Sequence, residues 1–272
     1  MASSFPGPAP EYARESTPEP AIVARLRAAG CVFAEDEARL ILSTARTPDD
    51  ASAMVERRAA GLPLEHVLGW AEFCGLRIVV EPGVFVPRRR TEFLVREAAA
   101  LAPPRPVVVD LCCGSGALGA TLVAGLDGFA LHAADIEPAA VRCARRNVEP
   151  FGGKVYEGDL FDPLPDALRG RVDVLLANVP YVPTGELGLM PPEARDHEPR
   201  AALDGGADGL DVLRRVTAEA VRWLAPGGRL LSEVSGPQVS GAVAAVERGG
   251  LAATVSVSEE AYATILIGTN SV

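Results

Sequence analysis

The sequence has few of the residues that metal and disulfide chemistry require. Its 272 residues include three histidines and five cysteines, and no two cysteines have the Cys-x-x-Cys spacing of a zinc site. An odd number of cysteines scattered along the chain is not typical of a disulfide framework. We therefore expect no metal centre and no disulfide scaffold.

The adjacent pair Cys112-Cys113 has two interpretations. Neighbouring thiols could act as a redox pair, or both could be small side chains that pack beside a turn. Free cysteine is among the most often buried residue types, which favours the packing interpretation.

Positive charge and long apolar runs are scarce as well. Lys and Arg number 26 against 36 Asp and Glu, which gives a net charge of −10. An acidic surface repels phosphate, so we expect no stable binding of nucleic acid. No stretch reaches the roughly 18 uninterrupted apolar residues of a membrane helix, and no basic start followed by an apolar run marks a signal peptide. We expect a monomer in the cytoplasm, without membrane attachment.

Composition and patterning divide the first third of the chain into three parts. Residues 1–20 are rich in proline and predict a disordered leader. Apolar residues at helical spacing over 21–69 predict a small helical domain, whose third helix is opened by Thr47-Pro48-Asp49. Residues 70–90 alternate loosely around Glu81-Pro82-Gly83, which predicts a linking β-hairpin that turns there.

The remaining residues, 91–272, alternate between strand and helix patterns. Strands are expected at 107–111, 130–134, near 155, and at 172–177, 228–234, 252–257 and 263–268. Helices are expected at 91–101, 117–126, 138–148, 210–224 and 239–247. Such alternation predicts an α/β fold with a mostly parallel sheet covered on both faces. The last two strands are too close for a crossover helix, so one of them should run antiparallel.

A glycine-rich turn follows the first strand of this part. Gly114, Gly116 and Gly119 match G-x-G-x-x-G, and Asp135 ends the next strand. Glycines let a ligand approach the backbone, and a carboxylate at that place can bind both hydroxyls of a ribose. A dinucleotide dehydrogenase and a methyltransferase both fit this pattern. Asp110 favours the methyltransferase, because a carboxylate suits a sulfonium and an amino group better than a pyrophosphate. The structural alternative is a glycine turn that Asp110 caps.

A second motif, Asn178-Val179-Pro180-Tyr181, follows the strand at 172–177. Ligands of parallel sheets bind beyond the carboxyl ends of the strands, so Asn178 is expected beside the cofactor. An amide nitrogen is a poor nucleophile because its lone pair is delocalised into the carbonyl group. Two acceptors on its N–H groups, the Asn178 side-chain oxygen and the Val179 carbonyl, would orient it and stabilise its growing charge. Pro180 restricts the residue before it, and Tyr181 offers a stacking face. The alternative is an ordinary turn.

Several stretches from Leu62 onward carry a resemblance to a known family. They are Leu64–Gly69 with Glu72-Phe73, Phe85–Arg88 with Thr91-Glu92, Asp110–Gly116 with Asp135, Asn178–Tyr181, Glu198-Pro199, Ala202-Leu203 with Gly205, and Asp208–Leu210. Together they resemble the bacterial release factor glutamine N5-methyltransferases of the HemK/PrmC family. The resemblance implies a Rossmann-like class I methyltransferase sheet behind a small N-terminal helical domain that recognises the substrate. It also implies an enzyme that transfers a methyl group from S-adenosylmethionine to the side-chain amide nitrogen of a glutamine. That glutamine lies in the Gly-Gly-Gln motif of a peptide chain release factor, which is then the partner.

The family's roles imply three groups of site residues. The cofactor-binding residues are Asp110, Cys112, Cys113, Gly114, Ser115, Gly116, Asp135, Ile136, Asp159, Leu160 and Asn178. The substrate-binding residues are Phe85, Pro87, Arg88, Thr91, Glu92, Asn178 and Tyr181. The catalytic residues are Asn178, Val179, Pro180 and Tyr181. The resemblance implies no metal.

The sequence departs from the family pattern at three places. Val179 replaces the first proline of Asn-Pro-Pro-Tyr, and Cys112 replaces a loop glycine. Arg89 and Arg90 replace a proline and an acidic residue of the Pro-Arg-Pro-Glu-Thr-Glu signature. No departure removes a catalytic group, but together they leave open an enzyme acting on another amide or on a nucleobase amino group. Two functions of other classes also stay open, namely a non-catalytic cofactor-binding module and an oxidoreductase.

Overall fold

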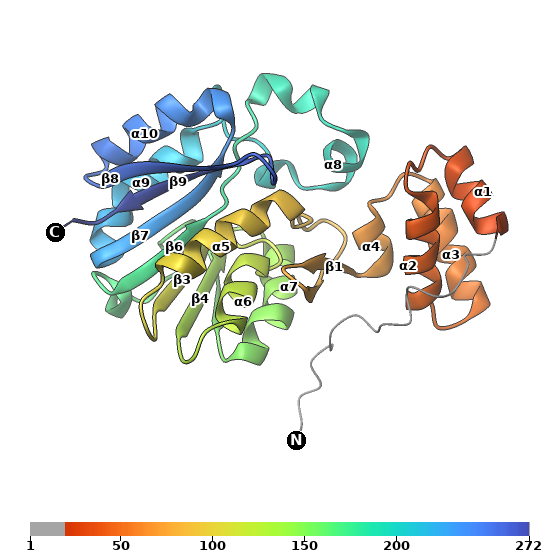
Figure 1. Cartoon of the computed structure of the whole chain (residues 1–272), viewed down its shortest axis with the longest axis horizontal. Helices are drawn as coiled ribbons and strands as arrows, with labels where there is room; N and C mark the ends of the chain where they lie inside the picture. The colour runs from red at the N-terminus through yellow and green to blue at the C-terminus, as the bar shows by residue number, and fades with distance from the viewer. Residues whose placement is uncertain (1–19, 272) are drawn as a thin grey trace.

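The computed structural model describes residues 20–271, which form a small helical domain and a larger α/β domain joined by a β-hairpin (Figure 1). The predicted leader, 1–20, lies outside the described residues except for Pro20, which begins the first helix. Within the described part, no helix is both long and apolar enough to cross a membrane.

The helical domain contains four helices around one apolar core. They are α1 (Pro20–Ala28), α2 (Ala34–Thr44), α3 (Pro48–Ala59) and the short α4 (Leu64–Leu68). Buried side chains such as Leu26 and Ile41 form the core, as the helical spacing predicts. Thr47 caps α3 by accepting a hydrogen bond from the Asp50 amide at 3.1 Å, which confirms the predicted start of this helix.

A buried arginine links this domain to the α/β domain. The Arg58 side chain on α3 donates to Glu37 on α2 at 2.6 Å and to Glu193 on α8 (Pro192–His197) at 2.7 Å. Arg58 is only 8% exposed, and a buried guanidinium is tolerated when its donors are matched by carboxylates. The contact holds the helical domain beside the segment that carries α8.

The hairpin turns earlier than the sequence predicted. Its strands are β1 (Trp70–Phe73) and β2 (Leu76–Val79), and Phe73 pairs with Leu76 across a two-residue turn. Cys74 and Gly75 both have positive φ, 48° and 75°, which is the geometry of a tight hairpin turn. A turn is present at 81–84, where the Val84 amide donates to the Glu81 carbonyl at 3.1 Å and Gly83 has φ of 80°. The prediction that the hairpin turns there was wrong, because the chain has already paired back on itself and residues 84–86 form no strand.

The α/β domain is built on a seven-stranded sheet with the order β5-β4-β3-β6-β7-β9-β8. The strands are β3 (Val107–Leu111), β4 (Ala130–Asp135), β5 (Lys154–Glu157), β6 (Val172–Ala177), β7 (Leu224–Val234), β8 (Ala252–Ser258) and β9 (Ala263–Thr269). All neighbours pair in parallel except β9, which is antiparallel to β7 and to β8. The mostly parallel sheet with a reversed C-terminal strand is thus confirmed. Strand β7 begins at Leu224, earlier than predicted, because Leu224 pairs with Val172 ahead of a register shift.

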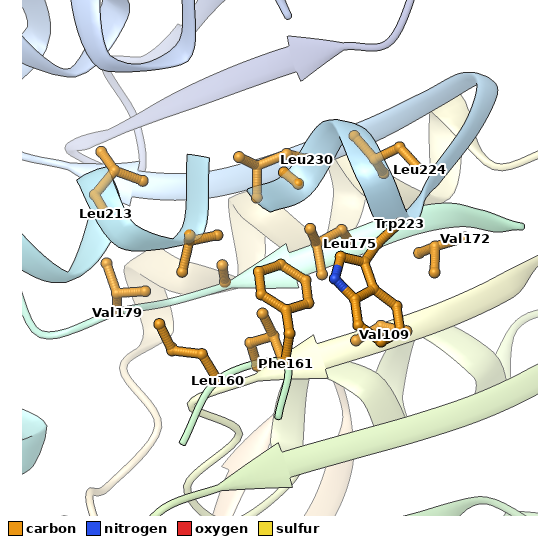
Figure 2. Close-up of a cluster of buried hydrophobic side chains, with 14 of the residues drawn as sticks. Val109, Leu160, Phe161, Val172, Leu175, Val179, Leu213, Trp223, Leu224 and Leu230 are labelled. Carbon is orange, nitrogen blue, oxygen red and sulfur yellow. The ribbon is translucent and has the colours of Figure 1, made fainter. Parts of the chain in front are cut away.

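Helices cover both faces of the sheet (Figure 1). The larger helices are α5 (Glu92–Leu101), α6 (Ala117–Ala124) and α7 (Pro138–Val148) on one face, and α9 (Asp211–Trp223) and α10 (Val239–Arg248) on the other. Short 3-10 turns lie at Arg89–Thr91, Glu149–Phe151, Asp166–Leu168, Thr184–Leu189, Arg200–Ala202 and Gly236–Gln238. Each face has its own core, and Figure 2 shows Phe161 beside Trp223 in the core under α9. Burying a side chain of this size contributes about 1.5–3 kcal/mol.

The strand order brings the two sequence motifs together. Strands β3 and β6 are neighbours, and Leu111 pairs with Ala177 at their carboxyl ends. From β3 the chain continues to β4 on one side, and from β6 it continues to β7 on the other side. The direction in which strands are added therefore reverses between β3 and β6. A switch point of this kind leaves a crevice in which ligands bind.

Candidate active site

A cavity opens at this switch point, and most of the predicted site residues line it. They are Phe85, Pro87, Arg88, Thr91, Asp110, Cys112, Cys113, Gly114, Ser115, Asp135, Ile136, Asn178, Val179, Pro180 and Tyr181. The glycine loop after β3 and the tetrapeptide after β6 therefore share one cavity, as the predicted site requires.

Four predicted residues lie outside the lining: Glu92, Gly116, Asp159 and Leu160. Glu92 accepts a hydrogen bond from the Cys74 amide at 3.1 Å and so ties α5 to the hairpin. Asp159 forms an ion pair with Arg215 of α9 at 2.6 Å, and Leu160 is buried in the core. Gly116 precedes α6 with φ of 75°, and a Cβ there would lie 2.7 Å from the Val148 side chain.

The lining includes residues that sequence reasoning missed. They are Val84, Arg90, Ala117, Leu118, Glu137, Ala140, Val182, Met190 and Ala201, while Pro199, Ala202 and Leu203 lie in a stretch that carried the family resemblance. Most are apolar, and they are spread over loops, helices α6 and α7 and the 3-10 turn at Arg200–Ala202, where apolar residues have no pattern that marks a site. Arg90 could have been identified as a lining residue, because it replaces an acidic residue of the family signature that contributes to the predicted site.

Asp135 shapes the glycine loop through both of its carboxylate oxygens. Oδ2 accepts from the Gly114 amide at 2.8 Å, and Oδ1 accepts from the Glu137 amide at 2.9 Å. Each carboxylate oxygen has a further lone pair for a ligand hydroxyl. Burial raises the pKa of Asp135, whereas the backbone amides lower it.

Two further features fix the conformation of the loop. Cys112 has φ of 51°, a left-handed conformation that costs a non-glycine residue about 1–3 kcal/mol. The Asn147 side chain of α7 donates to the Ser115 carbonyl at 2.8 Å and also binds the Val79 backbone of β2. Asn147 thereby couples the hairpin to the loop, which the sequence did not predict.

The surroundings of the two adjacent loop thiols favour the protonated form. Cys112 and Cys113 are free cysteines, and burial raises the pKa of both thiols. A thiol rather than a thiolate is a poor nucleophile, which supports the packing interpretation. Among the described residues, no group of His, Cys, Asp and Glu is arranged to hold a metal ion.

Asp110 lies beneath the loop with 1% of its surface exposed. Its Oδ2 accepts from the Gly119 amide at 2.9 Å, so the residue closes the first turn of α6. Burial is the main reason that the pKa of Asp110 is raised to about 8, with the Gly119 hydrogen bond opposing and Asp135 adding to the shift.

Asn178 lines the cavity and carries an acceptor atom that is not used within the described part of the chain. Its Oδ1 is buried and has no hydrogen-bond partner among the described residues, and the Val179 carbonyl likewise accepts no hydrogen bond there. A buried polar atom without a partner costs about 1–3 kcal/mol. The Val179 side chain points into the core beside Leu160 and Leu213 (Figure 2) and is 2% exposed. A ligand with two N–H groups could therefore donate a hydrogen bond to each of these two acceptors.

A neighbouring loop holds the tetrapeptide in place. The Val182 amide donates to the Leu203 carbonyl, and the Gly205 amide donates to the Val182 carbonyl, both at 2.9 Å. The buried Gln238 side chain donates to the Tyr181 carbonyl at 2.7 Å and to the Asp208 carbonyl at 3.0 Å. Gln238 is thus a positioning residue that no sequence pattern singles out.

Gly205→Ala is expected to disturb this loop. The new Cβ would lie 2.7 Å from the carbonyl oxygens of Pro180 and Gly209, so backbone must move and unfolding free energy should fall by about 1–3 kcal/mol. Denaturant unfolding and steady-state kinetics measure the effect, with a higher KM for the acceptor expected. Gly185→Ala is the control, because a Cβ there meets nothing within 4 Å. Equal behaviour of the two variants would contradict the account.

A hydrogen-bonded cluster of four residues forms the wall next to the tetrapeptide. Glu233, at the end of β7 and 3% exposed, accepts from Thr91 Oγ1 at 2.6 Å, from Arg90 Nε at 2.7 Å and from the Tyr181 hydroxyl at 3.0 Å. Arg90 also donates to the Tyr181 hydroxyl. Burial, with Glu233 adding to it, raises the pKa of Tyr181 to about 12, so the phenol stays protonated.

Arg88 anchors the other side of the entrance. Its guanidinium donates to both carboxylate oxygens of Glu198, at 2.7 and 2.6 Å, and lies over the Phe85 ring. Glu198 also accepts from the Val86 amide at 3.2 Å. Arg88 is therefore occupied by a structural partner on the segment that lines the cavity.

This fold and this site together define a Rossmann-like methyltransferase. The family model of the methyltransferase small domain matches residues 75–189. The fold is similar to that of a methyltransferase from Pyrococcus furiosus, with a TM-score of 0.55 and 15% identity over 82% of this chain and all of that chain.

Curated relatives specify the family. A release factor glutamine methyltransferase of Mycolicibacterium smegmatis is 40% identical over 73% of this chain and 72% of its own length. One from Geobacter sulfurreducens is 44% identical over 66% of this chain. A 4-amino-L-phenylalanine/4-methylamino-L-phenylalanine methyltransferase of Streptomyces pristinaespiralis is 39% identical over 66% of this chain. The chain belongs to the release factor glutamine methyltransferase family. Its matches to the Geobacter and Streptomyces proteins span 63% of the length of each.

S-adenosylmethionine is the cofactor of this class, and the residues present fit it. Asp135 can bind ribose hydroxyls, and the Gly114 region leaves backbone open to the ligand. Asp110 supplies a carboxyl group near the place where a cation would lie. When bound, the cofactor would supply an electrophilic methyl group on a sulfonium.

Affinity for S-adenosylmethionine is expected to rise with pH up to about 8, the pKa to which burial raises Asp110. A cationic ligand favours the ionised carboxylate, so below that pKa binding must release a proton, and above it the affinity levels off. Calorimetric titration at several pH values checks this. Asp110→Asn should flatten the profile, and a wild-type affinity that does not change with pH would contradict the assignment.

Proposed function

We propose that this chain transfers a methyl group from S-adenosylmethionine to the side-chain amide nitrogen of the glutamine in a release factor's Gly-Gly-Gln motif. The observation that carries the proposal is that Asn178 lines the same cavity as the glycine loop and that its buried Oδ1 has no hydrogen-bond partner among the described residues. Membership of the family supports the choice of acceptor.

The two acceptors at the tetrapeptide explain how an amide nitrogen could be methylated. Asn178 Oδ1 and the Val179 carbonyl accept the two N–H groups of the glutamine amide, which aims the nitrogen at the methyl group. As the nitrogen becomes positive in the transition state, both acceptors stabilise it more strongly than they stabilise the neutral amide. Once methylated, the nitrogen loses its proton to water, so no strong base is required.

A planar nitrogen attached to an aromatic ring is a second candidate acceptor. Its lone pair is also delocalised, and the same two acceptors would hold it. The relative from Streptomyces pristinaespiralis, which is named for 4-amino-L-phenylalanine and its methylamino derivative, favours this candidate. Another protein amide or a nucleobase amino group would use the same chemistry.

The direct test incubates the full chain with methyl-labelled S-adenosylmethionine and a purified release factor, followed by peptide mass mapping. The label should lie on the glutamine of Gly-Gly-Gln and should be absent from a release factor in which that glutamine is alanine. Free 4-amino-L-phenylalanine is assayed in parallel. Label on that amino acid and none on the release factor would overturn the proposed acceptor.

We also infer the surroundings in which the reaction takes place. Release factors act in the cytoplasm, so the proposed acceptor places the chain there. The helical domain, held beside α8 by Arg58, is proposed to recognise the release factor. We propose a monomer that forms no stable complex with nucleic acid, on the basis of its net charge of −10.

A further inference from the structure

The acceptor end of the cavity has an unusual charge balance for so acidic a chain. Of three consecutive arginines, Arg88 and Arg90 line the cavity and form ion pairs with two buried carboxylates, Glu198 and Glu233, whereas Arg89 is exposed outside the lining. The Arg88 Nη2 donates to both carboxylate oxygens of Glu198, which balances the charge of Arg88 and leaves its side chain 32% exposed. Arg90 is the more exposed of the two lining arginines, so the charge that a bound acceptor meets at this end depends most on Arg90.

Arg90 combines a structural partner with free donors in the cavity. Its Nε bonds Glu233 and its Nη2 bonds the Tyr181 hydroxyl, so two of the five N–H donors of a guanidinium are used. Its side chain is 47% exposed and lines the cavity. The remaining donors have no partner among the described residues and can bind a further anion.

Arg90 also sets the charge of the wall itself. Glu233 is buried next to the end of β6, and Arg90 is its one ion-pair partner in the described part of the chain. A carboxylate at position 90, as in the family signature, would place two negative groups around one phenol hydroxyl. With arginine there, the wall is neutral and presents the positive edge of a guanidinium to the acceptor.

We propose that Arg90 is a specificity-determining residue that makes this site favour an acceptor carrying a negative charge beside its planar nitrogen. The inference rests on the proposed function and deepens it by naming the charge class of the acceptor. A carboxylate next to the nitrogen gains charge-assisted hydrogen bonds from the free donors of Arg90. A cation at that place meets repulsion from the same guanidinium.

The test uses three versions of a release factor that differ only in the residue following Gly-Gly-Gln, which is Asp, Asn or Lys. For the wild-type chain, kcat/KM should be about tenfold higher for the Asp version than for the Lys version. The difference combines the attraction between Arg90 and the aspartate with the repulsion between Arg90 and the lysine. Arg90→Glu should reverse the order, Arg90→Gln should bring the ratio near one, and Arg90→Lys should retain the preference.

Arg89→Glu is the matched control, because it makes the same charge change at an exposed neighbour that does not line the cavity. It should leave the ratio within about twofold of wild type, since exposed charges are screened by salt. Thermal unfolding of every variant confirms folding, and Arg90→Gln and Arg90→Lys carry the test if Arg90→Glu does not fold. If the wild-type chain methylates all three acceptors equally, or if Arg89→Glu changes the ratio of kcat/KM as much as Arg90→Glu does, the proposed role of Arg90 is wrong while the proposed function still stands. Failure to methylate any of them counts against the proposed function itself.

Discussion

Replacing Asn178 with alanine is expected to lower kcat for methyl transfer by on the order of 10²- to 10³-fold, the usual cost of removing one preorganised polar group from a reacting centre. The Asn178 Oδ1 has no other partner among the described residues, so the loss falls on the acceptor rather than on the fold. Affinity for S-adenosylhomocysteine, measured by calorimetry, should change by only a few fold. Single-turnover kinetics with saturating acceptor separates the chemical step from binding.

Asn270→Ala is the matched control for this variant. Asn270 is also buried, but its amide donates to the Leu224 and Ala225 carbonyls where β7 begins, at the opposite end of that strand from Glu233. Its loss should lower the unfolding free energy by about 1–3 kcal/mol and leave kcat of the folded fraction nearly unchanged. If Asn178→Ala lost cofactor affinity and transfer to the same extent, Asn178 would be a structural residue.

Asp135→Ala is expected to weaken binding of S-adenosylhomocysteine by about 10- to 100-fold. Hydrogen bonds to a charged carboxylate contribute about 1.5–3 kcal/mol, and 1.4 kcal/mol is a factor of ten in affinity. The variant also releases the Gly114 amide, which Asp135 Oδ2 holds at 2.8 Å. Transfer measured at saturating cofactor should recover most of its rate, because Asp135 acts on binding and not on the acceptor.

Asp173→Ala controls for the loss of a backbone hydrogen bond. Asp173 accepts from the Val107 amide at 2.8 Å, at the amino end of β3 and away from the cavity. It should cost stability without changing cofactor affinity. Comparable loss of affinity in both variants would mean that Asp135 supports the sheet rather than the ligand.

The fold was largely predictable because its signals are local and regular. Apolar runs of strand length separated by helical patterns predict a parallel sheet, and the short link between β8 and β9 predicts the reversal. The hairpin shows where such signals compete. Glu81-Pro82-Gly83 is a strong turn pattern, yet the hairpin turns at Cys74 with positive φ, a conformation for which cysteine gives no sequence signal.

The site residues that lie at the ends of strands could be predicted from the sequence. Those whose side chains meet a residue far away in the sequence could not. Asp135 and Asn178 are at the tips of their strands, so topology alone brings them to one cavity. Arg90 and Glu233 are 143 positions apart, and Val79 and Asn147 are 68 apart. Their pairing depends on how helices and loops pack on the sheet, which periodicity does not encode.

We propose that Asn178 and the Val179 carbonyl hold the acceptor nitrogen beside the glycine loop. A crystal structure with S-adenosylhomocysteine and a Gly-Gly-Gln peptide tests it most directly. We expect the glutamine amide to donate to Asn178 Oδ1 and to the Val179 carbonyl, with its nitrogen facing the sulfur. A glutamine bound elsewhere, with Asn178 Oδ1 still lacking a donor, would contradict it.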